Sequence, residues 1–111
     1  MYPHYGGVTE KRRAHYLLTE IRAAFCDSMT LNRTYTSKTG ASALGMTDAD
    51  VVGVIQSLTN RDLHKSMTSL HDRSVWQDVY LPTWNGVGLY VKFTVDAQGN
   101  YLLISFKEAT E

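Results

Sequence analysis

A lysine interrupts an apolar row in the stretch DLHKSM, residues 62–67. Successive side chains of a strand alternate between its two faces, so Leu63, Lys65 and Met67 would share one face and His64 would lie on the other. Burying an unpaired charge is unfavourable, and a lysine in such a row commonly extends its ammonium group to solvent.

A glutamine interrupts the next apolar row, in SVWQDVYL, residues 74–81. Gln77 shares its nominal face with Val75 and Val79, where a strand glutamine usually finds a backbone partner. Strict alternation places Tyr90, Lys92 and Lys107 on a solvated face of two later strands, which is not the nominal face of Lys65 and Gln77. A bulge or strand twist could bring the two groups together. The core set opposite the solvated face is expected to be Leu89, Val91, Phe93, Leu102, Ile104 and Phe106.

No other familiar catalytic pattern is present. The four histidines have neither the spacing nor the carboxylate companions of a metal site, so we expect no metal and no cofactor. A Ser-His-Asp motif, a Cys-His motif and a phosphate-binding glycine loop are also missing from the sequence.

Composition limits the class of protein. The chain has 111 residues, 43% of them apolar, which suits one domain with a modest core. Eleven basic residues cancel eleven acidic ones, unlike a strongly basic nucleic-acid-binding protein. Cys26 is the single cysteine, which excludes an internal disulfide and fits a reducing cytoplasm. We expect no membrane span and no secretory signal, because no long apolar run occurs.

The first half of the chain is predicted to be mainly helical. A helical period begins after Thr9, a plausible N-cap, and ends near Asp27, which would make the basic run KRR at 11–13 a solvated first turn. Residues 30–36 predict a short edge strand, and residues 37–46 predict a short helix that stops at Gly45. The clearest helix is TDADVVGVIQSL, which Thr47 can cap.

The second half changes to a period of two. Strands are predicted over 62–69, 74–81, 87–95 and 101–107, separated by turn residues at hairpin spacing. We therefore expect an α+β fold, in which N-terminal helices flank a C-terminal antiparallel meander. Residues 1–8 are expected to form a flexible arm and residues 9–111 a single domain.

Several blocks of the sequence resemble the MqsR family of toxin–antitoxin ribonucleases. The stretch DLHKSMTSLHDRSVWQDVYLP resembles the family signature Asp-Phe-Tyr-Lys-Ser-Met-Thr followed by Trp-Gln-Asp-Val-Tyr-x-Pro. The resemblance continues through GLYVKFTV and LLISFKE, so that it covers residues 61–108 strongly and residues 1–46 in outline. It implies a RelE-like twisted antiparallel sheet and an endoribonuclease that cuts mRNA at short GCU-type sites without the ribosome.

The resemblance also implies which residues act. The residues that the family uses for activity map onto four catalytic positions: Lys65, Gln77, Tyr90 and Lys107. Further contacts to RNA are expected from His64, Lys92 and Tyr80. We expect a metal-independent reaction in which the lysines act mainly through charge.

The expected partners are mRNA and an antitoxin encoded beside the toxin. By the same resemblance, the antitoxin would carry a zinc-stabilised toxin-binding part and a DNA-binding helix-turn-helix part. Without it, direct DNA binding is not expected. A strand edge near residues 30–36 and the basic first helix are both candidates for the antitoxin interface.

Some features favour a second hypothesis, a catalytically weak relative that mainly binds RNA or its antitoxin. The zero net charge lowers the expected affinity for RNA. His64 replaces the usual tyrosine of the family, although it could instead supply a group that titrates near neutral pH. Leu81 stands where some members carry a basic residue. A third hypothesis, an unrelated small domain, would make the matching blocks a coincidence.

Overall fold

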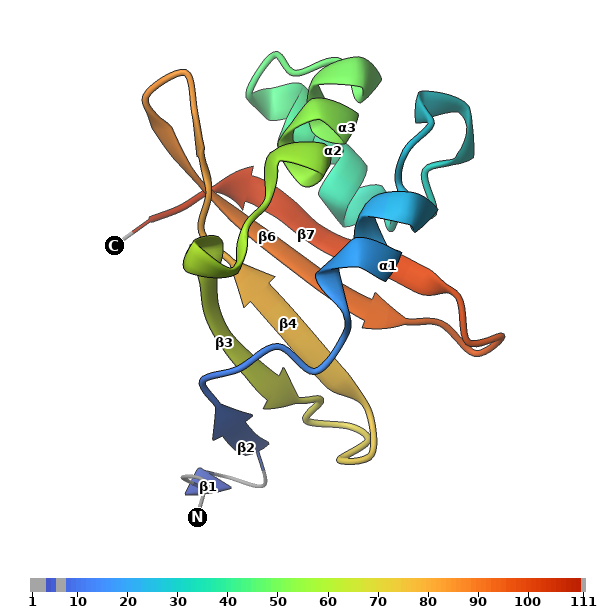
Figure 1. Ribbon diagram of the computed structural model, residues 1–111, viewed down its shortest axis with the longest axis vertical. Coiled ribbons are helices and arrows are strands. Elements are labelled where there is room, and N and C mark those ends of the chain that lie inside the picture. Colours follow the sequence, from blue (N-terminus) through green and yellow to red (C-terminus); the bar gives the residue numbers. More distant parts are fainter. Residues whose placement is uncertain (1–3, 6–7, 111) are drawn as a thin grey trace.

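The computed structural model describes residues 4–5 and 8–110 of the chain. Within these residues, seven strands form one sheet in the order β1-β2-β3-β4-β6-β5, and β7 pairs with β6. Every strand pair is antiparallel. Helices accompany the sheet (Figure 1), so the α+β prediction is confirmed.

The C-terminal meander is confirmed strand by strand. It consists of β3 (Leu63–Thr68), β4 (Trp76–Tyr80), β6 (Val87–Val95) and β7 (Tyr101–Glu108). Between β4 and β6 the chain adds a two-residue strand, β5 (Thr83–Trp84), which pairs with the start of β6. Asn85 and Gly86 join these two strands with φ angles of 48° and 80°. An Asn-Gly pair with positive φ angles is the preferred connection of a tight hairpin.

Two predicted helices are confirmed, and the first of them begins two residues earlier than predicted. The second helix, α3 (Asp48–Ser57), begins with a capping box. The Thr47 side chain accepts a hydrogen bond from the Asp50 amide, and the Asp50 side chain accepts one from the Thr47 amide. The helix predicted over 37–46 is α2 (Tyr35–Ala43), and Gly45 follows it with a φ angle of 70°. That left-handed conformation suits glycine, which explains the stop.

The predicted first helix is wrong over its first half. Residues that were expected to begin it form β2 (Val8–Lys11), which pairs with β3 on one side and with β1 (His4–Tyr5) on the other. The helix α1 is shorter, Leu18–Ala24, and Leu17 is 65% exposed. A strand next to β3 satisfies backbone groups that a helix would have left at an open sheet edge. Most of the predicted flexible arm, residues 1–8, lies outside the described residues. The boundary between this arm and the domain stays a prediction.

The predicted strand over 30–36 is also wrong. The segment contains the end of a short 3-10 turn, η1 (Ser28–Thr30), then a single bridge between Arg33 and Leu103, and then the start of α2. Thr34 caps α2 by accepting a hydrogen bond from the amide of Ser37, and this local bond favours a helix start over a strand. Residues 30–36 therefore offer no strand edge to an antitoxin. A second 3-10 turn, η2 (Asn60–Asp62), leads into β3.

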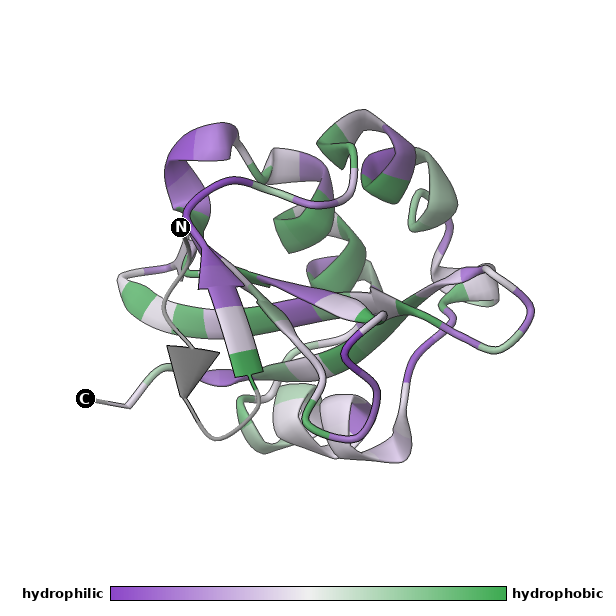
Figure 2. Cartoon of the chain, turned by 90° about the horizontal axis from the view of Figure 1, so that it is seen from below, coloured by the Kyte–Doolittle hydropathy of each residue, from purple (hydrophilic) through white to green (hydrophobic). Residues whose placement is uncertain are grey.

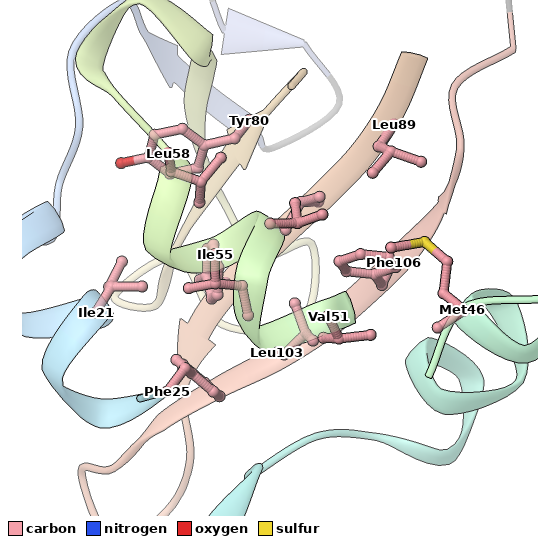
Figure 3. Close-up of a cluster of buried hydrophobic side chains, with 14 of the residues drawn as sticks. Ile21, Phe25, Met46, Val51, Ile55, Leu58, Tyr80, Leu89, Leu103 and Phe106 are labelled. Carbon is pink, nitrogen blue, oxygen red and sulfur yellow. The ribbon is translucent and has the colours of Figure 1, made fainter. Parts of the chain in front are cut away.

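One hydrophobic core lies between the sheet and the helices. Figure 3 shows α3 and α1 directing apolar side chains toward residues of the strands. Among the fully buried side chains are Ile21, Phe25, Val51, Ile55, Leu58, Leu89, Val91, Phe93, Leu103 and Phe106.

The phase of β7 differs from its predicted alternation. Lys92 pairs with Ser105 but Phe93 pairs with Leu103, which leaves Ile104 as an extra residue in a bulge. Leu103 is therefore fully buried, where Ile104 was expected. Apolar and polar residues otherwise alternate visibly along the strands (Figure 2).

Candidate functional site

One row of side chains crosses four strands on the face of the sheet that turns away from the core. Lys65 pairs with Val79, Val79 with Lys92, and Lys92 with Ser105. Residues directly opposite each other in an antiparallel sheet share a face. The neighbouring row, which includes Tyr80, belongs to the core. Two lysines far apart in the sequence thus stand on either side of one valine.

A second row brings in the remaining predicted residues of the later strands. Tyr90 pairs directly with Lys107. The Nζ atoms of Lys107 and Lys92 lie 5.3 Å and 5.7 Å from the centre of the Tyr90 ring. These distances allow each ammonium group to interact with the aromatic ring. We call the surface formed by Lys65, Tyr90, Lys92 and Lys107 the lysine face.

Strict alternation was wrong in placing Lys65 and Gln77 on a different face from the later residues. The inward row of β4 contains Asp78 and Tyr80, so Gln77 points to the lysine face. On β3 the register shifts between Leu63 and Lys65, which leaves the intervening residue in a bulge. This bulge turns Leu63 toward the core while Lys65 joins the opposite face.

Gln77 lies one row away from the lysines. Its direct partner is Met67, and Met67 is paired in turn with Glu10 of β2. Gln77 is half-buried and lies at the border of the lysine face.

An ion pair joins β2 to the lysine face. The carboxylate of Glu10 accepts a hydrogen bond of 2.6 Å from Lys65 Nζ. Both side chains keep more than a quarter of their surface exposed, 27% for Lys65 and 29% for Glu10. Glu10 was not predicted as a site residue, because a helix was expected to begin after Thr9. The β-branched pair Val8-Thr9 is the one local signal that favours a strand there.

The crowding of positive charge changes how two groups titrate. Burial, and then the charges of Lys107 and Lys65, lower the pKa of Lys92 from its ordinary value of 10.5. Burial raises the pKa of Tyr90, and the charge of Lys65 partly offsets that rise. The lysine face therefore favours the arrival of an anion, which would relieve the repulsion among the ammonium groups.

His64 lies at a pocket next to the lysine face. The residue is exposed and occupies the β3 bulge. The pocket has a volume of about 480 Å³ and is lined by His64, Leu81, Gly88, Tyr90, Ala109 and Thr110. His64 and Tyr90 are thus two aromatic groups on the wall of one cavity.

The prediction that Tyr80 contacts RNA is wrong, because Tyr80 lies in the core. Its side chain is 0% exposed and lies among the core residues in Figure 3. Burial raises its pKa to about 12. Its hydroxyl group has no hydrogen-bond partner among the described residues.

A buried carboxylate holds the strands that carry Lys65 and Gln77. Asp78 is fully buried and accepts hydrogen bonds from the backbone amides of His15 and Tyr16 and from the hydroxyl of Ser66. These bonds tie the segment between β2 and α1 to the middle of the sheet. A buried carboxylate needs such partners, and these satisfy it with short, charge-assisted bonds.

Of the basic run at 11–13, Lys11 points away from the lysine face. Lys11 is paired with Ser66, on the core side of the sheet, and its Nζ lies 4.1 Å from the centre of the Trp76 ring. The ring of His15 stacks on Trp76 with centroids 5.1 Å apart. Lys11 ends a strand instead of starting a helix, and Arg12 and Arg13 are exposed.

Neither a metal site nor a membrane-spanning helix is present among the described residues. No three His, Cys, Asp or Glu side chains among them are grouped as metal ligands would be. No helix within the same residues has the length and apolar character to cross a membrane.

Comparison with known proteins gives two matches. Residues 13–108 match the family described as motility quorum-sensing regulator, toxin of MqsA. The chain is 33% identical over 99 residues to the mRNA interferase toxin MqsR of Escherichia coli (strain K12). That alignment covers 89% of this chain and 98% of the relative.

Proposed function

The chain belongs to the MqsR toxin family, and from this premise we propose that it is an endoribonuclease that cuts mRNA and so arrests translation and growth. The observation that carries the proposal is the lysine face. Three ammonium groups and one tyrosine, drawn from three strands, meet on an accessible surface. Such a group can bind and polarise the phosphate of an RNA strand.

The proposed reaction uses the RNA's own 2′-hydroxyl group as nucleophile. Its oxygen attacks the adjacent phosphorus, the bond to the 5′ oxygen breaks, and a 2′,3′-cyclic phosphate remains. Lys65 and Lys107 stabilise the extra negative charge on the phosphate oxygens during this step. The protein supplies charge and alignment, and we propose that no metal ion takes part.

The other residues have supporting roles in this proposal. Tyr90 stacks on a base, and Gln77 donates a hydrogen bond to the phosphate or to a base edge. His64 and Lys92 contact the RNA strand on either side of Tyr90. The pocket between His64 and Tyr90 has the aromatic walls that an unstacked base prefers.

The finer properties follow the family resemblance. We propose cleavage at short GCU-type sites, independence of the ribosome, and action in the cytoplasm, where mRNA is translated. Neutralisation would come from an antitoxin with a zinc-stabilised toxin-binding part and a helix-turn-helix part.

Induced expression in cells tests the proposal directly. Wild type should arrest growth and create new mRNA 5′ ends at one short motif, and Lys65→Ala should do neither. A purified chain should cut a transcript that contains the motif without ribosomes and in the presence of EDTA. Loss of cleavage in EDTA would contradict the metal-independent reaction.

The alternative is a catalytically weak member that binds RNA or its antitoxin. The ion pair between Glu10 and Lys65 favours it, because it neutralises one of the charges that the reaction needs. A folded wild-type chain that binds the transcript and yields no new ends would establish this alternative.

A further inference from the structure

Glu10 lies beside Lys65 at the border of the lysine face. It stands on the same face as Lys65 and Gln77, in the row Glu10–Met67–Gln77 that borders the lysine face. Its Oε2 atom accepts the hydrogen bond from Lys65 Nζ, and no partner is found for its Oε1 atom among the described residues. One oxygen of the carboxylate is thus held by the lysine while the other remains available.

The fold does not depend on this ion pair alone. The side chains of Lys65 and Glu10 are still 27% and 29% exposed, so solvent screens part of their attraction. The strand that carries Glu10 is already held by backbone pairing to β3 and by the hydrogen bond from the Thr9 amide to the Thr68 hydroxyl. A carboxylate beside a phosphate-binding lysine also weakens the binding of an anion. A role of Glu10 in the reaction would offset this loss.

The proposed reaction lacks one participant. A 2′-hydroxyl group becomes a good nucleophile when a neighbouring group accepts its proton. The ammonium groups of Lys65 and Lys107 carry their protons already and cannot accept another. A glutamate carboxylate is an acceptor at neutral pH and needs no prior loss of a proton.

We propose that Glu10 is a catalytic residue, the general base that accepts the proton of the attacking 2′-hydroxyl group. The inference rests on the proposed ribonuclease function. Glu10 precedes residues 13–108, the segment that matches the toxin family. Lys65 then has two tasks: it orients the carboxylate and places positive charge next to the phosphate.

The step balances without a further reactant. The 2′ O–H proton moves to Glu10 Oε1 as the bond from the 2′ oxygen to phosphorus forms. The bond from phosphorus to the 5′ oxygen then breaks, and the 5′ oxygen takes a proton from an ammonium group of the lysine face. Water restores both groups by taking the proton from Glu10 and returning one to the lysine.

The charges around Glu10 are predominantly positive. From β3 it meets Lys65, and farther across the sheet the lysine face adds Lys92 and Lys107. The carboxylate of Asp78 on β4 lies on the opposite face.

The test is Glu10→Gln in the full chain, with cleavage of a short RNA that wild type cuts. The single-turnover rate should fall about 100-fold to 10,000-fold. Binding of the same RNA with 2′-O-methyl groups should be unchanged or tighter, because a competing negative charge is removed. The wild-type rate should decline at acid pH with a single ionisation, and the variant should lose this acid limb.

A matched control is Glu20→Gln, which removes the same charge from α1, where Glu20 accepts a hydrogen bond from Tyr101. It should leave the cleavage rate within about threefold of wild type.

Two results would overturn the inference. A Glu10→Gln rate equal to or above that of wild type would show that the carboxylate only neutralises Lys65. If the variant does not fold, the wild-type profile decides, because a rate that stays flat at acid pH rules out a carboxylate base. Failure of wild type to cut any RNA would instead contradict the proposed function itself.

Discussion

The hydroxyl group of Ser66 donates a 2.6 Å hydrogen bond to the buried carboxylate of Asp78. Ser66 directly follows Lys65 in the chain and lies on the opposite face of β3. The same carboxylate binds the backbone of residues 15 and 16. The Asp78 carboxylate, which solvent does not reach, therefore holds β3, the strand that carries Lys65, from the core side of the sheet. Removing this anion should affect the fold more than any change on the lysine face itself.

Asp78→Ala should destabilise the chain strongly. The change leaves the Ser66 hydroxyl and two backbone amides without their acceptor, and each buried unpaired group costs about 1–3 kcal/mol. We expect a loss of roughly 3 kcal/mol or more in the free energy of unfolding, measured by denaturant titration. Asp72→Ala is the control, because Asp72 is exposed and, among the described residues, its side chain bonds only to Ser74 in the same turn. An Asp78→Ala loss as small as that of the control would contradict the assigned role.

A pair of glycines in two helices should respond in opposite directions to alanine. A Cβ atom on Gly40 of α2 would lie 2.1 Å from the backbone oxygen of Phe106, whereas a Cβ atom on Gly53 of α3 meets nothing within 4 Å. Gly40→Ala should destabilise by about 1–3 kcal/mol through overpacking of α2 on β7. Gly53→Ala should stabilise by about 0.5–1 kcal/mol, because alanine is the better helix former.

Thermal unfolding of these two variants measures the effect. If both variants gain stability, the close approach between α2 and β7 is not required. Because Phe106 precedes Lys107, the Gly40 variant should also reduce RNA cleavage in proportion to the displacement of β7.

Local signals explain which parts of the fold were predictable. The helix stop at Gly45 and the Thr47 cap depend only on neighbouring residues, and both were predicted from the sequence. The strand β2 was not, because its pairing partner Ser66 lies more than fifty residues further along the chain. Long-range pairing of this kind overrides local helical periodicity.

The site was predictable as a set of residue types but not as an arrangement. The resemblance predicts roles for Lys65, Tyr90 and Lys107, and the structure brings them to one face. Strict alternation had placed Lys65 on a different face from the other two. Alternation fails wherever a bulge adds a residue, as it does at His64 and Ile104. Glu10 was not predicted as a site residue, because only the pairing of β2 with β3 brings it next to Lys65.

Removal of one lysine should change how its neighbour titrates. The charge of Lys107 is, after burial, the larger of the two charges that lower the pKa of Lys92. Lys107→Gln should therefore raise the pKa of Lys92 toward its ordinary value, because the lost charge opposed protonation. Nuclear magnetic resonance of the lysine side chains over a pH titration measures this change. Lys38→Gln, an exposed change on α2, is the control and should leave the pKa of Lys92 unmoved.

Tyr80→Phe tests whether Tyr80 belongs to the core or to the RNA-binding surface. The Tyr80 hydroxyl is buried without a hydrogen-bond partner among the described residues, so its removal relieves an unfavourable burial. We expect unchanged or higher stability, by up to about 1 kcal/mol, and an unchanged rate of RNA cleavage. Tyr90→Phe, on the lysine face, should leave stability nearly unchanged and lower cleavage if its hydroxyl contacts RNA. A cleavage defect in Tyr80→Phe at unchanged stability would return Tyr80 to the functional site and contradict its assignment to the core.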